Sequence, residues 1–533
     1  MEPERQPNQL RQRLLERRTT RRALLAGTAA VAAAGTTAVV LGAALPEGGD
    51  TAATPLDAAP QPTRPDVGAG AATKGAVAAR TAPPVAPLSE AQRRAAHLLR
   101  RAGFGGTMAE IDEFAKLSRE EAADRLLSFD KIDNSALESR LQAAGLDITS
   151  ASFGDLRPPD MIRWWLMRMA YTKRPLEERM TLTWHGWLTS QVSKIGPQRA
   201  KLMIRQNQLY RQMALPKFDE LVKAVSKDPA MLIYLDTEKS AKEHPNENYA
   251  RELMELFTMG VGNYTENDVR ESARAFTGWR MTPPKRTGDK TADLANYDPQ
   301  FVVAARDHDF GAKTFLGQTG TWGGDDIVDI IMRQPATGRF VTTRLFREFA
   351  HDSPEPATVD RLVKVWDSSG HNVREVVRAI LVSDEFYSDQ SYRALVRSPV
   401  DFLVGMVRAL EMETPFLGLE RTARGMDQLL FEPPNVAGWP GGPAWLSSST
   451  FFARVNTLDL AMFSRGRPAL AALGAAKTPE EAVDAAATRL IDGNLPPESR
   501  AAIVTYAATL RNDQERASAV AYLVLASPEY QLI

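Results

Sequence analysis

From residue 88 onward the chain carries the local signals that start and continue α-helices. Polar residues precede acidic residues at capping-box spacing in 118–121 and 265–268, and in 478–481 a Thr is followed by Pro at the first helical position. Apolar residues recur every three or four positions in segments such as 359–366 and 376–380. Hardly any segment alternates between apolar and polar residues as a half-buried strand would. These patterns predict an all-α fold, a large multi-helical domain.

Two short segments, 301–303 and 313–316, are instead typical of strands, because β-branched and aromatic residues are frequent in them. Both lie in an irregular stretch between Thr282 and Asp325, and residues 309–311 between them end in a glycine suited to a turn. We therefore predict a short irregular insertion that contains a β-hairpin around 309–311.

Length, charge and cysteine content narrow the class of protein further. The chain has 533 residues, whereas single cores stop growing at about 250–300 residues. We expect residues 88–533 to form one helical domain or two lobes. Because 65 Lys and Arg nearly balance 66 Asp and Glu, nucleic acid is not an expected partner. The absence of cysteine excludes disulfides, thiolate metal sites and cysteine nucleophiles.

Residues 1–45 have the pattern of an export signal. Seven arginines and three glutamates make residues 1–22 basic, and a charge-free run of small and apolar residues follows. Arg21-Arg22 with Leu24-Leu25 behind is similar to the twin-arginine consensus, in which Phe is commoner than Leu24. We predict a twin-arginine-type signal that engages the twin-arginine translocase and is cleaved after about Ala44. A Sec signal or a retained anchor is the alternative, since the run is long enough to span a bilayer.

Residues 46–87 consist mainly of Ala, Pro, Thr, Gly and Asp. Such a segment buries too little apolar surface to offset the entropy lost on ordering. We therefore predict a disordered linker between the signal and the folded domain. The protein is expected to be exported, and to be extracellular, periplasmic or associated with the cell envelope. Contact with a membrane is expected only if the signal segment is retained.

Four segments are rich in polar and aromatic residues that a plain helical scaffold does not need. They are HLLRRAGFG at 97–105, NENYARELMELF within 246–279, DHDFGAKTF at 307–315, and PPNVAGWPGG within 433–445. In this order they resemble the bacterial domain-of-unknown-function-1800 (DUF1800) family, from about Leu88 to the carboxyl terminus. The resemblance implies a largely helical fold, an export signal and a sulfatase-like exported protein as a partner. It implies no established activity.

The chain departs from the family pattern at Trp184-His185-Gly186-Trp187. Family members often have His-x-His after a Trp, whereas Trp187 occupies the second histidine position here. His185 is therefore either a core histidine or a lone metal ligand from this segment.

The helix predicted around 247–257 places several charges on one face. Glu247, Arg251 and Glu255 are spaced by four residues, so Arg251 is expected between two carboxylates. Glu252 and Glu255, three residues apart, can approach a common ligand. The segment fits either a structural ion network or a site in which Glu252 and Glu255 are catalytic and Arg251 binds the substrate.

His308, between Asp307 and Asp309, is the strongest candidate for chemistry. Imidazole beside carboxylates suits a divalent transition metal or a general acid–base pair, although the spacing matches no standard zinc motif. We predict His308 and Asp309 as catalytic residues and Lys313 as the partner of an anionic group. If a metal is bound, His185 and His308 are the predicted ligands. The alternative is that His308 and Asp309 bond the loop backbone.

Trp439 stands in a glycine-rich segment that also contains Gly438, Gly441 and Gly442. Glycine allows close backbone approach, and a Trp face suits sugar rings or apolar groups. We predict Trp439 as a substrate-binding residue, with a rigid structural corner as the alternative.

Two functional hypotheses follow from these residues. In the first, the protein is a metal-assisted or acid–base enzyme acting on an envelope or extracellular polymer. In the second, it is a non-catalytic binding or scaffold protein that partners a sulfatase-like exported protein or glycans. Convergence of His185, His308 and the Glu252 helix in one pocket would favour the enzyme, and separate placement would favour the binding protein.

Overall fold

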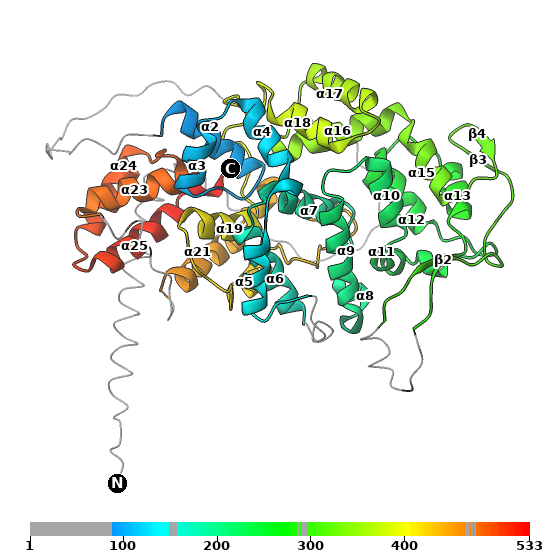
Figure 1. Cartoon of the computed structure of the whole chain (residues 1–533), viewed down its shortest axis with the longest axis horizontal. Coiled ribbons are helices and arrows are strands. Elements are labelled where there is room, and N and C mark those ends of the chain that lie inside the picture. The colour runs from blue at the N-terminus through cyan, green and yellow to red at the C-terminus, as the bar shows by residue number, and fades with distance from the viewer. Residues whose placement is uncertain are drawn as a thin grey trace, which may run out of the picture. The chain divides into compact units, whose positions relative to one another are not determined.

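α-Helices make up most of the described chain, and the predicted all-α fold is confirmed (Figure 1). The computed structural model describes residues 88–148, 157–284, 288, 297–463, 470, 473 and 476–533. The signal predicted at 1–45 and the linker predicted at 46–87 lie outside these residues. Ala86–Ile533 form a single compact unit.

The helices of the described residues are α2 (Glu90–Arg101), α3 (Met108–Phe114), α4 (Arg119–Leu127), α5 (Ser135–Ala143), α6 (Pro158–Tyr171), α7 (Pro175–Trp187), α8 (Val192–Ile195), α9 (Lys201–Gln212), α10 (Phe218–Ser226), α11 (Pro229–Tyr234), α12 (Glu247–Glu252), α13 (Glu266–Ala275), α15 (Gly324–Met332), α16 (Pro335–Phe349), α17 (Pro356–Ser368), α18 (Val373–Leu381), α19 (Pro399–Ala409), α20 (Leu419–Gly425), α21 (Ser448–Phe463), α23 (Pro479–Ile491), α24 (Pro497–Ala507) and α25 (Asp513–Leu525).

Three helices begin at the capping residues that the sequence predicts. Ser118 accepts a hydrogen bond from the backbone of Glu121 at the start of α4, and Thr265 and Thr478 cap α13 and α23 in the same way. Each such cap contributes about 1 kcal/mol by satisfying a backbone N–H that the helix leaves open.

The segment after α12 continues as a π-helix over Leu253–Thr258 rather than as an α-helix. The Thr258 hydroxyl donates to the Leu253 carbonyl at 2.5 Å and so bridges the widened turn. A π turn contains more residues than an α turn, so side chains beyond it point in directions that α-helical spacing does not predict.

The two predicted strand segments form strands and the predicted insertion with a short β-hairpin is confirmed, but the hairpin lies at 313–320 and not around 309–311. β2 (Phe301–Val303) pairs antiparallel with β1 (Trp279–Met281), and β3 (Lys313–Phe315) pairs antiparallel with β4 (Gln318–Gly320). A tight turn in which Leu316 and Gly317 both have positive φ joins β3 to β4. Such a turn suits the twist of a two-residue hairpin better than the longer loop around 309–311.

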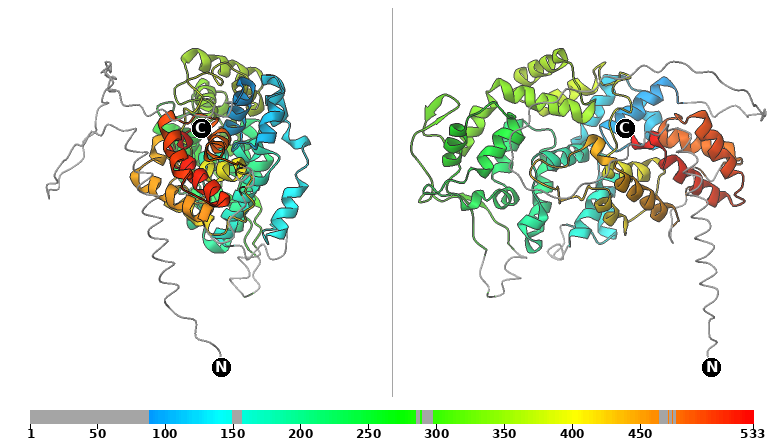
Figure 2. Two further views of the ribbon diagram at one scale, coloured as in Figure 1. Left: turned by 90° about the vertical axis from the view of Figure 1, so that its left-hand side faces the viewer. Right: turned by 180° about the vertical axis from the view of Figure 1, so that it is seen from behind.

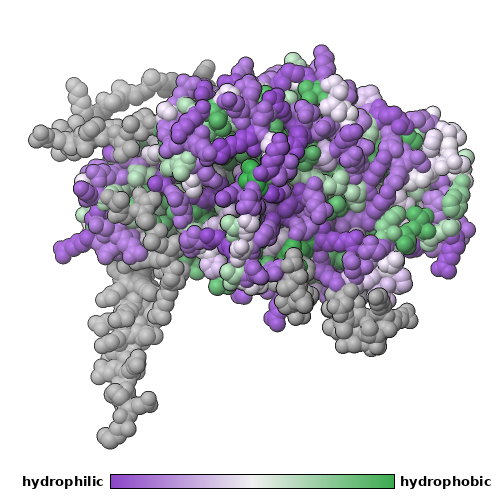
Figure 3. Space-filling view, in the orientation of Figure 1, coloured by the Kyte–Doolittle hydropathy of each residue, from purple (hydrophilic) through white to green (hydrophobic). Residues whose placement is uncertain are grey.

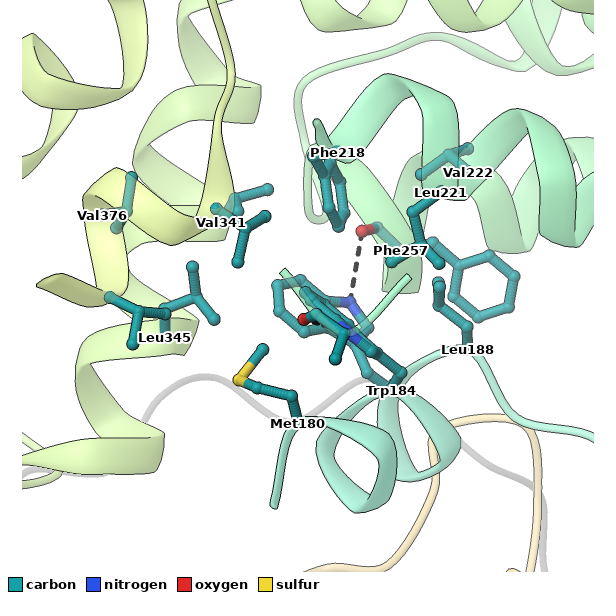
Figure 4. Close-up of a cluster of buried hydrophobic side chains, with 14 of the residues drawn as sticks. Met180, Trp184, Leu188, Phe218, Leu221, Val222, Phe257, Val341, Leu345 and Val376 are labelled. Carbon is teal, nitrogen blue, oxygen red and sulfur yellow. Dashed lines mark hydrogen bonds between the residues drawn. The ribbon is translucent and has the colours of Figure 1, made fainter. Parts of the chain in front are cut away.

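Trp184 and Trp187 of α7 lie in the buried core. Their ring centroids are 5.4 Å apart, and both rings contact Phe218 of α10. The two indole N–H groups donate to the carbonyls of Ala214 and Phe257, which satisfies them inside the core. Figure 4 shows Trp184 among apolar side chains from α10, α16 and α18. This packing holds α7 rigidly against the helices that carry the candidate site.

The carboxyl-terminal helices pack on one another and on the middle of the fold. α23 contacts α24, α25 and α19, and α25 also contacts α21. Figure 2 shows the orange and red helices grouped at one end of the described helices. On the face in Figure 3, hydrophilic residues dominate and hydrophobic ones form small scattered groups. Within the described residues, no helix has both the length and the apolarity needed to cross a membrane.

Candidate functional site

The glycine-rich segment around Trp439 packs closely against α7 through a pair of glycines, Gly438 and Gly186. Gly438 has a φ of +85°, and a Cβ at this position would lie 2.1 Å from the Gly186 carbonyl oxygen in α7. A Cβ on Gly186 would in turn lie 3.5 Å from the Trp439 ring. Only glycine at 438 permits this approach, because the positive φ disfavours other residues and there is no room for a Cβ. The close contact places Trp439 against α7.

Further hydrogen bonds fasten the segment before Gly438 to the residues that follow α7. The Val192 N–H donates to the Phe431 carbonyl at 2.9 Å, and the Thr189 hydroxyl donates to the Val436 carbonyl at 2.7 Å. Residues 431–439 are therefore held along the end of α7, although they lie more than two hundred positions away in the sequence.

A cavity of about 310 Å³ opens beside this junction. Its size is within the range of ligand-binding sites. Its walls come from the end of α2, from α7, from α16 and from the segment around Trp439, so two of the four motif segments contribute to it. Its charged and indole-bearing lining residues are Arg101, Arg179, Arg344, Arg347, Glu348, Asp352, Asp401, Trp187, Trp439 and Trp445.

Two of the four arginines are buried and serve the framework. Arg101 donates to the carbonyls of Phe349 and Ala350 at 2.7 and 2.8 Å, which caps the carboxyl end of α16. Burial lowers its pKa to about 9. Arg179 bonds the Gly103 carbonyl and pairs with Asp401. These two cations fix α2, α7 and α16 around the cavity.

Arg344 is the cation best placed to receive a ligand. Its guanidinium lies over the Trp187 ring, 4.4 Å from the centroid, and one nitrogen donates to the Leu256 carbonyl at 3.1 Å. Burial lowers its pKa to about 10, so it remains charged at neutral pH. No carboxylate of the described residues lies within ion-pair distance of it, although the charge of Glu348, on the same helix, partly offsets the effect of burial on its pKa. A cation in this position still gains from an added anion. Arg347, on the same helix, is exposed and donates to the Asp352 carbonyl.

His185 lies behind Trp439 rather than in the cavity wall. Its ring centroid is 5.4 Å from that of Trp165 and 5.5 Å from that of Trp439, and its Nε2 accepts the Phe431 N–H at 3.2 Å. Burial lowers its pKa to about 3, so the ring is neutral at physiological pH. In this environment His185 positions Trp439, and its predicted role as a metal ligand stays a prediction.

His308, Asp309 and Lys313 lie in and beside the loop between β2 and β3. His308 Nδ1 is 2.7 Å from the Thr277 carbonyl oxygen, and Lys313 Nζ donates to two loop carbonyls at 2.6 and 3.0 Å. Asp309 pairs with Arg274 at 2.7 Å, which holds the pKa of its carboxyl below the usual value. The Gly311 N–H also donates to Asp309 Oδ1 at 2.8 Å, so both His308 and Asp309 bond backbone groups. A catalytic role for these residues stays a prediction.

The predicted arrangement of Arg251 between Glu247 and Glu255 is wrong. Arg251 pairs with Glu247 at 3.3 Å and with Glu266 of α13 at 2.8 Å. Glu255 instead accepts a hydrogen bond from the Tyr264 hydroxyl at 2.7 Å. The π-helix that begins at residue 253 turns Glu255 away from the face it would occupy in an α-helix.

Glu252, the last residue of α12, is partly buried. Burial raises the pKa of its carboxyl, and the charge of Glu255 raises it further. The approach of Glu252 and Glu255 to a common ligand, which their spacing suggests, stays a prediction. Their predicted catalytic role stays a prediction.

The contacts of the predicted residues fall into separate environments. His185 contacts aromatic rings of the α7 junction, whereas His308 contacts the end of α13 and Phe310. In the part of the chain that the structure describes, no three His, Asp or Glu side chains are grouped to hold a metal ion.

The arginines of α16 were missed by sequence reasoning. Three arginines stand against a single glutamate in 335–349, and this excess of cations on one helix was the available signal. In the sequence Trp187 stands out only as the replacement for a histidine, whereas in the structure its ring packs against the Arg344 guanidinium.

Fold and cavity together define a largely α-helical protein with a cavity that is lined by arginine, carboxylate and tryptophan side chains. Residues 97–532 match the family model described as Protein of unknown function (DUF1800), and the chain belongs to this family, as its motifs predicted. No curated protein and no solved structure matches the chain.

Proposed function

We propose that this protein is an exported, non-catalytic binding protein for acidic saccharides. The observation that carries the proposal is Arg344, a partly buried cation that stacks on Trp187 and has no ion-pair partner among the described residues. Taking such a charge out of water is costly unless an anion compensates it. An acidic group of a ligand in the cavity would do so, and a guanidinium can bind a carboxylate or sulfate through two hydrogen bonds.

The tryptophan and glycine content of the cavity favours a sugar as the carrier of that acidic group. Trp439 is partly exposed at the wall, and the backbone of Gly441 and Gly442 lines the cavity beside it. An indole face packs well on the C–H face of a sugar ring, while uncovered backbone groups bond its hydroxyls. A simple inorganic anion would leave this aromatic surface unused.

Calorimetric titration of the full exported chain with a heparin-derived tetrasaccharide tests the proposal, with neutral maltotetraose as the matched sugar. We expect the acidic tetrasaccharide to bind and maltotetraose to bind weakly or not at all. Arg344→Met should weaken binding by about tenfold or more, because it removes a desolvated charge contact. Arg421→Met, at an arginine that is 82% exposed, should change affinity little. Equal loss in both variants, or no binding by the wild type, would refute the proposal.

The carboxylate pair Glu252 and Glu255 supports a second candidate, an acid–base enzyme acting on the same class of polymer. A carboxyl with a raised pKa beside a second carboxylate is the arrangement that general acid catalysis uses. Chromatography of the tetrasaccharide after long incubation distinguishes the two functions. Cleavage that is lost in Glu252→Gln while binding persists would establish the enzyme, and an intact ligand favours the binding protein.

We also expect the protein to be exported and to have a sulfatase-like exported protein as a partner. Export rests on residues 1–45 and the partner on the family resemblance. An acidic saccharide fits such a partner chemically, since sulfate esters are one source of its charge.

A further inference from the structure

We infer that the ligand is a polymer that extends from the cavity along α16 into a second cavity, which binds additional acidic sugar units. This inference rests on the proposed function and adds the length of the ligand and a second binding site. It is carried by the arrangement of residues on the exposed face of α16.

The second cavity has a volume of about 710 Å³ and is markedly cationic. Its lining contains three arginines and no carboxylate. The lining residues from α16 are Ala336, Arg339, Phe340, Thr343, Arg344 and Arg347, and the remainder follow the π-helix. A surface with three cations and no acid favours an anionic ligand with several charges.

The two cavities meet at Arg344 and Arg347, which line both of them. The lining residues of α16 follow the spacing of one helix face, so they form a continuous strip. From Arg339 to Arg347 the strip runs about 12 Å along the helix axis, at 1.5 Å per residue. Cations spread over this distance match charges on successive units of a chain better than charges on one sugar ring.

Phe340 provides an apolar surface between the two ends of the strip. Its ring is partly exposed, and its centroid lies 6.1 Å from that of Trp187. A Cβ on Gly260 would come within 3.1 Å of this ring, so Gly260, with a φ of +81°, keeps the opposite wall low. The strip therefore combines cations with an aromatic ring, and the first cavity also contains both kinds of side chain.

Arg339, at the far end, is paired with Asp360 of α17 at 2.5 Å. Both side chains are more than half exposed, at 53% and 58%, so this pair contributes little by itself. A polymer that reaches Arg339 can replace Asp360 as its partner. The pair thus makes affinity for a long ligand depend on Asp360.

Affinity as a function of chain length tests the inference. The full exported chain is titrated with a heparin-derived disaccharide and with an octasaccharide. We expect the octasaccharide to bind at least about tenfold more tightly, because contacts made by linked units reinforce one another. Arg339→Met should weaken only the octasaccharide, whereas Asp360→Asn should strengthen it and leave the disaccharide unchanged.

The outcomes separate the two levels of the proposal. If the disaccharide and the octasaccharide bind with equal affinity per site and Arg339→Met has no effect, the second cavity does not bind the ligand. The proposed acidic saccharide site in the first cavity would still stand. A gain with length that Arg339→Met does not reduce would also overturn binding in the second cavity. Failure of both saccharides to bind would refute the proposed function itself.

Discussion

At Gly438 a single missing Cβ permits the contact on which the candidate site depends. The residue has a positive φ and faces the Gly186 carbonyl, whereas Gly441 has a positive φ with no atom within 4 Å of a Cβ. Alanine at Gly441 would therefore cause backbone strain alone, whereas alanine at Gly438 would cause backbone strain and steric overlap. The same junction brings Trp439 against His185. A substitution at Gly438 is therefore expected to displace Trp439, which lines the cavity.

Gly438→Ala should lower the free energy of unfolding by about 3 kcal/mol or more, since the overlap forces a backbone shift. Gly441→Ala should cost only about 1 kcal/mol, the strain of a left-handed conformation. Urea titrations followed by circular dichroism measure both. Equal effects in the two variants would mean that strain alone, and not the contact with Gly186, makes glycine necessary.

His185 should make the protein sensitive to mild acid. Its folded pKa of about 3 lies below the usual 6.5, so between these values protons bind the unfolded chain preferentially. Stability therefore falls as the pH falls from about 6.5 toward about 3. At pH 5 the loss attributable to this residue is about 2 kcal/mol, at 1.36 kcal/mol per pH unit below the usual pKa.

His185→Gln keeps an acceptor for the Phe431 N–H but cannot take up this proton. The unfolding free energies of the wild type and the variant, measured at pH 7 and pH 5, should converge as the pH falls. Parallel pH profiles would show that His185 is not held neutral by burial.

At the scale of the element, α16 depends on a cation that comes from α2. Arg101 bonds the last carbonyls of α16, where the helix dipole is negative. The helix in turn presents Arg339, Arg344 and Arg347 along its exposed face. An arginine of α2 thus fixes the carboxyl end of α16, while the arginines of α16 itself line the two cavities.

Arg101→Met should destabilise the protein by about 3 kcal/mol, because it leaves buried carbonyls without a donor while filling a similar volume. Arg94→Met, which removes a 42% exposed guanidinium 3.6 Å from Glu90, should change stability by less than about 0.5 kcal/mol. Thermal and urea unfolding measure both variants. Similar losses would indicate that the bonds to α16 are not what Arg101 contributes.

At the scale of the whole molecule, the predicted destination depends on residues 1–45. Replacing Arg21 and Arg22 together by Lys should retain the full chain in the cytoplasm, because the translocase reads the arginine pair. Leu24→Phe, which restores the commoner residue, should preserve export. Cell fractionation and immunoblotting of the three chains provide the measurement. Export of the double-lysine chain would favour the Sec pathway instead.

Helix positions and family membership could be read from the sequence because their signals are local. A capping box such as Thr265–Asp268 and an apolar spacing of three or four residues act within one or two turns, and both appear in the structure as predicted. The strand segments 301–303 and 313–315 were recognisable for the same reason. The motif strings, long and in a fixed order, were sufficient to identify the family.

The partners of these elements were decided only by the tertiary structure. β2 pairs with β1 and not with β3, the π-helix redirects Glu255, and Arg101, Trp187, Arg344 and Trp439 meet from segments far apart in the chain. Which distant segments come together depends on packing and loop closure over the whole fold, and no local spacing records it. The sequence therefore determined where the helices begin and which family the chain joins, whereas the cavity exists only because the packed helices bring those four side chains together.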